Sequence, residues 1–357
     1  MAEPGVLFVS GEYPPDLGGV GDYTAHLRAA LPVASSVLTR QDVGRWDARA
    51  LIRLVQVAPR NGIVHIQYQP AAFDLLGDVC LMPLVLRAIR TRVVTTLHDA
   101  RVPYLFPGAG PLRWQAVRLL ARTSHAVIAA DERDLRALRV RRGHIISIGS
   151  NVVRQPPADY DRSAFRARLG IASSTLAVVY FGLLNASKGL DTLLDAFELL
   201  SAQRDARLML VGGTAGASDA TDRATASVLA ARLTRLGDRV IRTGFLAPDQ
   251  VSAHLLAADV ALLPYRDGAS PRRGSLLACA EHGLPIVSTL PAGDAVAEAV
   301  LAVAHDDAAS LAPAVLRVAD DAHLSARLRA GSRALAERAS WSRIADQHVS
   351  LYCQLWR

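Results

Sequence analysis

The chain has 357 residues, of which 51% are hydrophobic and 20% are charged. This composition indicates a folded protein, and the length suits two domains of ordinary size. The three cysteines are widely spaced and form no Cys-x-x-Cys motif and no Cys/His cluster. This spacing indicates neither a disulfide framework nor a structural zinc site. No apolar run reaches the roughly 18 to 20 residues that span a bilayer, and the N-terminus lacks a signal-peptide pattern. We therefore expect a cytoplasmic protein.

The positive charge is concentrated in the first part of the chain. The net charge is +7 at pH 7, and residues 1–156 carry 19 arginines against 12 acidic residues, whereas the remainder is balanced at 21 of each sign. A basic first domain favours an anionic partner, such as an acidic substrate or a peripheral contact with the inner face of a membrane. The chain shows no interleaving of aromatic and basic residues typical of RNA-binding segments, so we expect no nucleic-acid partner.

Short apolar segments alternate with helical ones in this first part. Buried strands are predicted at 6–10, 63–68, 93–98, 126–130 and 145–150. Stretches between them, such as LMPLVLRAIR, have apolar residues at helical spacing. Apolar strands that alternate with helices are typical of a parallel sheet covered on both faces.

The same alternation restarts after the segment RQPPADYD at 154–161, whose prolines predict a linker. Further strands are predicted at 176–182, 207–213, 240–244, 260–265 and 285–289. We therefore predict an α/β protein with two Rossmann-like, doubly wound parallel-sheet domains, residues 1–156 and 157–339, that face each other across a cleft. Ligands bind at the carboxyl ends of the strands in such sheets.

Two motifs follow predicted strands of the first domain. GEYPPDLGGVGDY comes directly after the first strand, and its glycines would let a ligand approach the backbone at the start of a helix. TTLHDA places His98 at the carboxyl end of a buried strand, where a side chain can reach a ligand. A purely structural turn and a purely structural histidine are the alternatives.

The second domain contains the only lysine of the chain. Lys188 lies in GLLNASKGLDTLLDAF, and the other 39 basic residues are arginines. Lysine provides a compact ammonium group, whereas arginine provides a broad planar fork. The retention of Lys188 favours a site that needs a small cation, although one lysine can also persist by chance.

Together these segments resemble the retaining glycosyltransferases of family 4, which have the GT-B fold, and the resemblance extends over most of the chain. EYPPDLGGVGDY resembles the glycine loop on the acceptor side, TLHD the sugar-contacting histidine, and GLLNASKGL the start of the donor domain. TGFLAPDQVSAHLLAADVALLPYRDGAS resembles the donor-side strands. The closing amphipathic helix, residues 340–357, resembles the element that packs back on the first domain.

The resemblance implies a binding site on each domain. His98 is expected to contact the transferred sugar, and Lys188 the diphosphate of the donor. The candidates on the acceptor side are Gly18, Gly19, Tyr23 and Tyr68. The further candidates on the donor side are Gly19, Asn185, Asp267, Gly268, Ser270, Gly274 and Ser275.

The chain departs from the family pattern at three positions. Leu183 replaces the family's diphosphate-binding arginine, and the Glu-x7-Glu pair falls on Ser270 and Ala278 in SPRRGSLLACAEHGLP. We expect Arg272 and Arg273 to restore the lost charge, since guanidinium–phosphate contacts are strong, and Arg273 to act in catalysis. Glu281 lies on a neighbouring helical face and is a candidate for the ribose contact; a surface carboxylate is the alternative.

We therefore predict a retaining, metal-independent hexosyltransferase of carbohydrate biosynthesis. It would move a sugar from a nucleoside diphosphate sugar to a hydroxyl of a small-molecule, glycan or lipid-linked acceptor, with no cofactor and no bound metal. One alternative is a GT-B phosphorylase or an enzyme that isomerises or hydrolyses nucleotide sugars. The other is a catalytically decayed nucleotide-binding protein. These motifs do not specify the donor base, the sugar, the acceptor or the oligomeric state.

Overall fold

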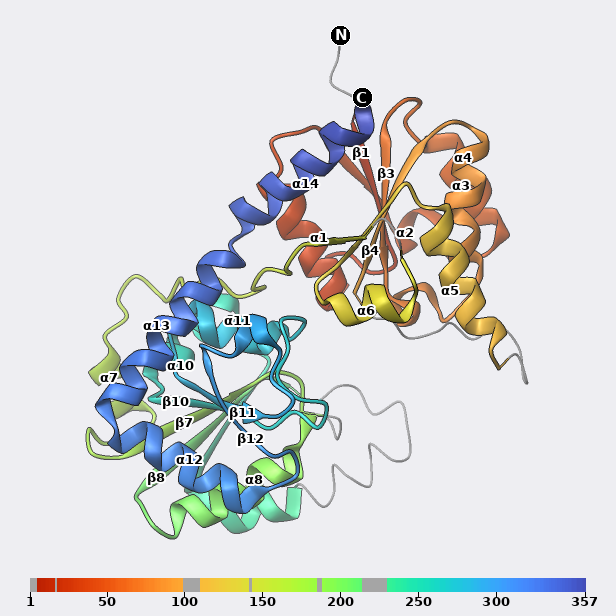
Figure 1. The fold of residues 1–357 in the computed structure, drawn as a ribbon. Coiled ribbons are helices and arrows are strands. Elements are labelled where there is room, and N and C mark those ends of the chain that lie inside the picture. Colours follow the sequence, from red (N-terminus) through yellow and green to blue (C-terminus); the bar gives the residue numbers. More distant parts are fainter. Residues whose placement is uncertain (1–4, 17, 99–109, 141–142, 185–187, 214–229) are drawn as a thin grey trace. The chain divides into compact units, whose positions relative to one another are not determined.

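The computed structural model describes residues 5–16, 18–98, 110–140, 143–184, 188–213 and 230–357 (Figure 1). The chain forms two compact units. Unit 1 consists of Met1–Asn151 together with Ala339–Arg357, and unit 2 of Val152–Arg338. The proline-containing segment 154–161 therefore lies at the beginning of unit 2.

Unit 1 contains a six-stranded parallel sheet with the strand order β2-β1-β3-β4-β5-β6. Its strands are β1 (Val6–Ser10), β2 (Ser35–Leu38), β3 (Ile63–Tyr68), β4 (Arg92–Leu97), β5 (Ala126–Ala129) and β6 (Gly143–Ile145). Its described α-helices are α1 (Gly19–Ala30), α2 (Arg40–Val43), α3 (Ala48–Val57), α4 (Met82–Ala88), α5 (Leu112–Thr123), α6 (Glu132–Ala137) and α14 (Trp341–Trp356). The sequence analysis did not predict β2, and it placed the sixth strand at 145–150, beyond β6.

Alternating residues of β1 explain how both faces of this sheet are covered. Phe8 belongs to the core cluster that α1 and α14 supply, whereas Leu7 and Val9 belong to the cluster that α3, α4 and α5 supply. Successive side chains of a strand point to opposite faces, so a wholly apolar strand requires helices on both sides. Figure 1 shows α14 alongside α1 on one of these faces.

The C-terminal helix α14 is also joined to the sheet by polar contacts. The Tyr352 hydroxyl lies 2.6 Å from Nδ1 of His65 on β3, and Nε2 of the same imidazole lies 2.7 Å from Oγ1 of Thr96 on β4. All three side chains are buried. Buried polar groups need such partners, so this chain of contacts fixes the position of α14 on unit 1.

Unit 2 contains a second six-stranded parallel sheet, with the order β12-β11-β10-β7-β8-β9. Its strands are β7 (Leu176–Phe181), β8 (Ala206–Val211), β9 (Val240–Gly244), β10 (Val260–Leu263), β11 (Ile286–Thr289) and β12 (Val300–Val303). Its described α-helices are α7 (Arg162–Arg168), α8 (Leu190–Ser201), α10 (Pro248–Ala257), α11 (Gly274–Glu281), α12 (Ala308–Asp320) and α13 (Ala322–Arg338). The edge strand β12 was not predicted from the sequence. Among the described residues, no helix has both the length and the apolar character needed to cross a bilayer.

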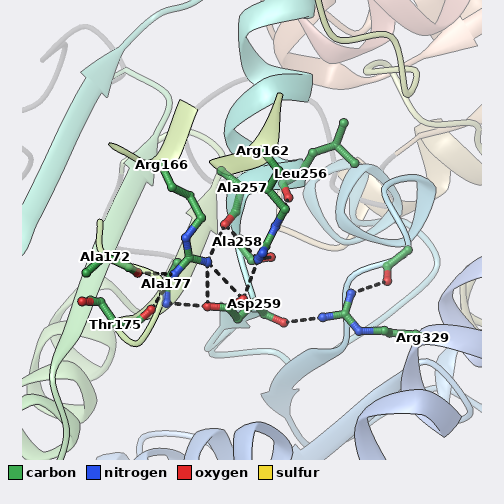
Figure 2. Close-up of polar contacts among 11 residues, drawn as sticks. Arg162, Arg166, Ala172, Thr175, Ala177, Leu256, Ala257, Ala258, Asp259 and Arg329 are labelled. Atoms are coloured by element: carbon green, nitrogen blue, oxygen red, sulfur yellow. Dashed lines mark hydrogen bonds and ion pairs between the residues drawn. The ribbon is translucent and has the colours of Figure 1, made fainter. Parts of the chain in front are cut away.

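Arginine side chains surround Asp259 at the amino ends of β7 and β10 (Figure 2). Nη1 of the buried Arg166 lies 3.0 Å from the Asp259 carboxylate, and Nη2 donates to the Thr175 carbonyl at 2.5 Å. The same carboxylate accepts the backbone N–H of Ala177 at 2.8 Å and a 2.6 Å contact from the half-exposed Arg162. The guanidinium of Arg166 therefore links α7 to both strands.

We predict unequal effects for the two arginines that contact Asp259. Arg166→Ala leaves a carboxylate and several carbonyls without their buried partner, so unit 2 should lose about 3 to 5 kcal/mol of stability. Arg162→Ala removes a half-exposed ion pair and should cost under about 1 kcal/mol. Urea unfolding of both variants measures the difference, and equal losses would contradict it.

Candidate active site

The predicted histidine of unit 1 lies directly after β4. The His98 backbone N–H donates to the Tyr68 carbonyl of β3 at 3.0 Å, and the imidazole packs edge-on against Tyr23 of α1, with ring centroids 4.8 Å apart. The structure therefore brings His98, Tyr23 and the start of α1 together at the carboxyl ends of β1 and β4. Parallel sheets offer their ligand sites at this edge.

Gln67 holds the His98 ring, a role that the sequence analysis missed. The buried Gln67 Oε1 lies 2.8 Å from His98 Nε2. Because a carboxamide oxygen only accepts, the imidazole donates from Nε2, and its Nδ1 remains an acceptor in the neutral ring. Burial lowers the pKa of His98 to about 3, and the nearby His348 acts in the same direction. His98 is therefore neutral at physiological pH.

The acceptor-side candidates fall into two groups. Gly19 starts α1, is exposed, and has open space where a Cβ would lie, so its backbone is accessible to a ligand. Tyr68, in contrast, is wholly buried in the core that packs under α4 and α5, and Tyr23 is also buried. Tyr68 therefore supports the sheet and presents no surface to an acceptor.

Gly18 makes room for a carboxylate that the sequence analysis did not consider. A Cβ at Gly18 would lie 1.8 Å from Oε2 of Glu12. Burial raises the pKa of Glu12, and the charges of Asp16 and Asp22 add to this effect. The start of α1 therefore carries a half-buried carboxyl group that can bind hydroxyls, and the only sequence signal for it was its place after β1.

In unit 2, Lys188 lies beside Tyr265. The chain leaves β7 at Gly182, whose φ of +135° favours glycine, and returns to α8 through Gly189 at φ +72°. A Cβ at Gly189 would lie 1.9 Å from the Pro264 carbonyl, so Gly189 packs closely on the segment after β10. As a result, the Lys188 Nζ lies 5.7 Å from the centroid of the Tyr265 ring.

Arg273 contacts the same aromatic ring. Its guanidinium carbon lies 4.7 Å from the Tyr265 centroid, and the Tyr265 hydroxyl lies 2.6 Å from Oγ of Ser275. A cation within about 6 Å of an aromatic face is stabilised by the ring. One buried tyrosine therefore brings together the ammonium of Lys188 and the guanidinium of Arg273, which are 85 positions apart in the sequence.

The start of α11 completes this cationic region. Arg273 is the N-cap residue, and the first backbone bond of the helix runs from the Leu277 N–H to the Arg273 carbonyl at 3.0 Å. The amides ahead of it have no partner within the helix, and the helix dipole adds positive potential there. Beyond the adjacent residues and the backbone of α11, no described atom lies within 4 Å of a Cβ position at Gly274, so a ligand can approach these amides.

Other donor-side candidates have internal roles. Asp267 forms an ion pair with Arg273, and Gly268 is buried, where a Cβ would lie 2.2 Å from the Pro291 carbonyl. Ser270 is buried and its Oγ accepts the Arg272 N–H at 3.3 Å. Asn185 lies outside the described residues. Within this group the structure places Lys188, Arg273, Gly274 and Ser275 together.

Glu281 lies at the opposite end of α11 from Arg273. Eight residues of helix separate them by about 11 Å, and the Glu281 carboxylate accepts a backbone hydrogen bond from Arg154. Burial raises the pKa of Glu281, while Arg154 opposes the shift. The expected ribose contact of Glu281 therefore finds no support in its position.

The described residues contain no group of three or more His, Cys, Asp or Glu side chains that could hold a metal ion. The sequence does contain the Asp-x-Asp pattern at Asp159–Tyr160–Asp161. In the structure, Asp161 is the N-cap of α7 and accepts the Ala164 N–H at 2.8 Å. Capping accounts for this carboxylate.

Comparisons with known proteins show which proteins the chain is similar to. Residues 175–321 match the family model for glycosyl transferases group 1. The D-inositol 3-phosphate glycosyltransferase of Jonesia denitrificans is 24% identical, over 94% of this chain and 91% of that protein. The 2-deoxystreptamine glucosyltransferase of Streptomyces kanamyceticus is 28% identical, over 87% and 83%.

Solved structures show the same fold at low identity. HepE of Anabaena, in complex with UDP and glucose, has a TM-score of 0.75 at 19% identity and covers 99% of this chain and 100% of its own. Sucrose-phosphate synthase of Thermosynechococcus elongatus has the same score and identity, over 99% of both chains. The chain is a glycosyltransferase with the GT-B fold.

The contact between Gln67 and His98 gives a testable prediction. Gln67→Leu removes the acceptor that fixes the imidazole, so kcat should fall about tenfold or more with little change in the donor KM. Gln67→Glu places a carboxylate against the Nε2–H and should raise the pKa of His98, so that protonation of Nδ1 lowers kcat at a higher pH than in the wild type. Steady-state kinetics as a function of pH measure both effects.

The matched control is Gln115→Leu, which alters an exposed glutamine of α5. It should leave the pH profile unchanged. A wild-type pH profile and kcat in both Gln67 variants would show that Gln67 has no positioning role.

Proposed function

We propose that the chain is a retaining, metal-independent glycosyltransferase of family 4 that moves a sugar from a nucleoside diphosphate sugar to a hydroxyl acceptor. One observation carries this proposal: Lys188 and Arg273 lie on the same Tyr265 ring, 5.7 and 4.7 Å from its centroid, next to the first turn of α11. This region has the charge and the free amides that a diphosphate requires.

The cations would act on the leaving group. When the bond between the sugar and the diphosphate breaks, negative charge develops on the departing phosphate oxygen. Preorganised positive charge stabilises this transition state without further rearrangement. Lys188, Arg273 and the amides of Gly274 and Ser275 would supply it, with Arg273 replacing the family arginine that is lost at Leu183.

His98 would orient the transferred sugar. Its neutral imidazole has Nδ1 as an acceptor, which suits a hydroxyl of the sugar and not a phosphate. Retention of configuration is inferred from the family resemblance. The acceptor is expected to bind near the exposed backbone of Gly19 and the carboxyl group of Glu12.

The relatives suggest which substrates to test first. UDP is the nucleotide in the HepE complexes, so UDP-glucose is the first donor. A phosphorylated inositol and 2-deoxystreptamine, named for the relatives above, are the first acceptors. The purified enzyme should form a glycoside with retained configuration, detected by mass spectrometry and NMR, and excess EDTA should not reduce the rate. Inhibition by EDTA that added metal reverses would refute metal independence.

A second function is favoured by the missing carboxylates. Ser270 and Ala278 occupy the Glu-x7-Glu positions, and neither side chain has a carboxylate to offer a donor. Both residues are also buried. A catalytically decayed nucleotide-binding protein would show this pattern. It would bind a nucleoside diphosphate in calorimetry and form no product with any donor. An enzyme that hydrolyses nucleotide sugars would form product without an acceptor. A phosphorylase would also form product without an acceptor, but only when phosphate is added.

The lone lysine gives the sharpest test of the donor site. Lys188→Arg keeps the charge, but the broader planar group does not fit between Tyr265 and the phosphates, so kcat/KM should fall about tenfold. Lys188→Ala should lose about 100-fold or more, since the leaving group loses a cation. Steady-state kinetics with one donor provide the measurement. Full activity of the arginine variant would refute a requirement for an ammonium group.

A further inference from the structure

A second polar pocket lies in unit 1, away from His98. It has a volume of about 360 Å³ and is lined by Asn61, Arg87, Arg90, Thr91, Arg92 and His125. These residues precede β3, β4 and β5 or begin them, so the pocket lies at the amino ends of these strands. His98 follows the carboxyl end of β4, about 20 Å away along the six-residue strand. The pocket is thus distinct from the candidate active site.

The lining contains three arginines and no acidic residue. Within the ranges that the structure describes, none of Arg87, Arg90 and Arg92 forms an ion pair with a carboxylate. One guanidinium contact joins the carboxyl ends of α4 and α5, because Nη1 of Arg87 donates to the Thr123 carbonyl at 3.4 Å. Three like charges in one pocket repel one another, so the site favours a bound anion.

Two further groups offer hydrogen bonds. Thr91 is only 1% exposed, and within the described chain its Oγ1 has no partner. Buried hydroxyls are normally paired, so this residue of the pocket lining keeps an unused hydrogen-bonding group. His125 Nδ1 accepts the Val93 N–H at 2.9 Å, which leaves Nε2–H as the donor of the neutral ring. Burial lowers the pKa of His125, and Arg87 and Arg92 lower it further.

The backbone at Arg90 has an uncommon conformation. Arg90 follows α4 with a φ of +61°, and the Thr91 N–H bonds back to the Leu86 carbonyl at 3.0 Å. Glycine or asparagine is usual at this position of a helix end, because a Cβ disfavours the left-handed conformation. Arg90 nevertheless occupies it, and its side chain contributes to the pocket lining.

Apolar side chains continue the surface next to the pocket. Leu84 and Ile89 of the α4 region are 50% and 37% exposed, and Leu119 of α5 is 37% exposed. Both helices lie on the same face of the sheet (Figure 1). Exposed apolar residues beside a basic pocket are typical of surfaces that contact anionic lipids.

We propose that the pocket lined by Arg87, Arg90, Thr91, Arg92 and His125 binds a phosphate group, carried by an anionic lipid headgroup or by a soluble phosphate compound. The guanidinium groups neutralise its charge, and the Thr91 hydroxyl and the His125 N–H donate to its oxygens. This assignment does not depend on the proposed function, because the pocket lies at the other edge of the sheet.

The test compares two triple variants of equal net charge. Arg87→Gln, Arg90→Gln and Arg92→Gln together alter the pocket, whereas Arg317→Gln, Arg327→Gln and Arg333→Gln alter exposed arginines of unit 2. One arm measures sedimentation with vesicles of phosphatidylglycerol or of phosphatidylcholine, and the other measures inorganic phosphate by calorimetry. Both variants keep the donor site, so phosphate that binds there contributes equally to both. The difference in affinity between the two variants therefore reports on the pocket.

The pocket variant should lose binding on the order of 100-fold, and the control should bind like the wild type. Loss of phosphatidylglycerol binding assigns the lipid source, and loss of phosphate binding alone assigns a soluble one. Equal losses in both variants would overturn the proposal, as would a wild-type protein that binds neither probe.

A single substitution without change of charge gives an independent test. Thr91→Val preserves the shape of the side chain and removes its hydroxyl, so the affinity for the probe that binds should fall severalfold. Circular dichroism and thermal unfolding confirm that the variant is folded. Unchanged affinity would show that general surface charge, and not this pocket, attracts the anion.

Discussion

The buried contact between Arg166 and Asp259 is the constraint on which the donor side of the molecule depends. It holds the amino ends of β7 and β10 together with α7. The same two strands lead, at their carboxyl ends, to Lys188 and to Tyr265. An ammonium and a guanidinium can share one aromatic ring only if the strands that carry them keep a fixed spacing and register. The ion pairs of Asp259 thus hold the amino ends of the two strands whose following segments carry Lys188 and Tyr265.

Tyr265 contacts the two cations that, in our proposal, compensate for the arginine missing at Leu183. At Leu183 the cation is missing from the loop after β7, and the structure provides another from the loop after β10, since Arg273 reaches the same ring as Lys188. The replacement comes from a different strand but reaches the same region of space. What a diphosphate requires is positive potential at one place, and electrostatic stabilisation does not depend on which strand supplies it. For the missing Glu-x7-Glu carboxylates, the candidate Glu281 offers no such replacement, because it contacts Arg154 at the far end of α11.

In unit 1, buried hydrogen bonds hold the side chains of the candidate site in place, whereas in unit 2 charged contacts do so. His98 is held by Gln67, and behind it His65 connects Tyr352 of α14 with Thr96 of β4. Burial keeps the pKa of His98 near 3, so the ring acts as a neutral hydrogen-bonding group. The opposite edge of the same sheet concentrates arginine charge around an open pocket. Around His98 the sheet thus relies on buried hydrogen bonds, whereas the amino ends of β3, β4 and β5 gather arginines, because the two ends of a parallel sheet are lined by different loops.

The sequence by itself determined the two parallel-sheet units and the placement of His98 and Lys188 after strands, because these follow from local apolar periodicity. It predicted Tyr68 and Glu281 as ligand contacts, whereas in the structure Tyr68 is buried in the core and the Glu281 carboxylate accepts a hydrogen bond from the Arg154 backbone. It did not predict β2 and β12, which are short edge strands with weak patterns. Only the tertiary structure decided that Gln67 orients His98, that Tyr265 joins Lys188 to Arg273, and that Thr91 and three arginines form one pocket. Each of these depends on side chains from different strands, and their distances are set by strand order and packing, which no local sequence pattern encodes.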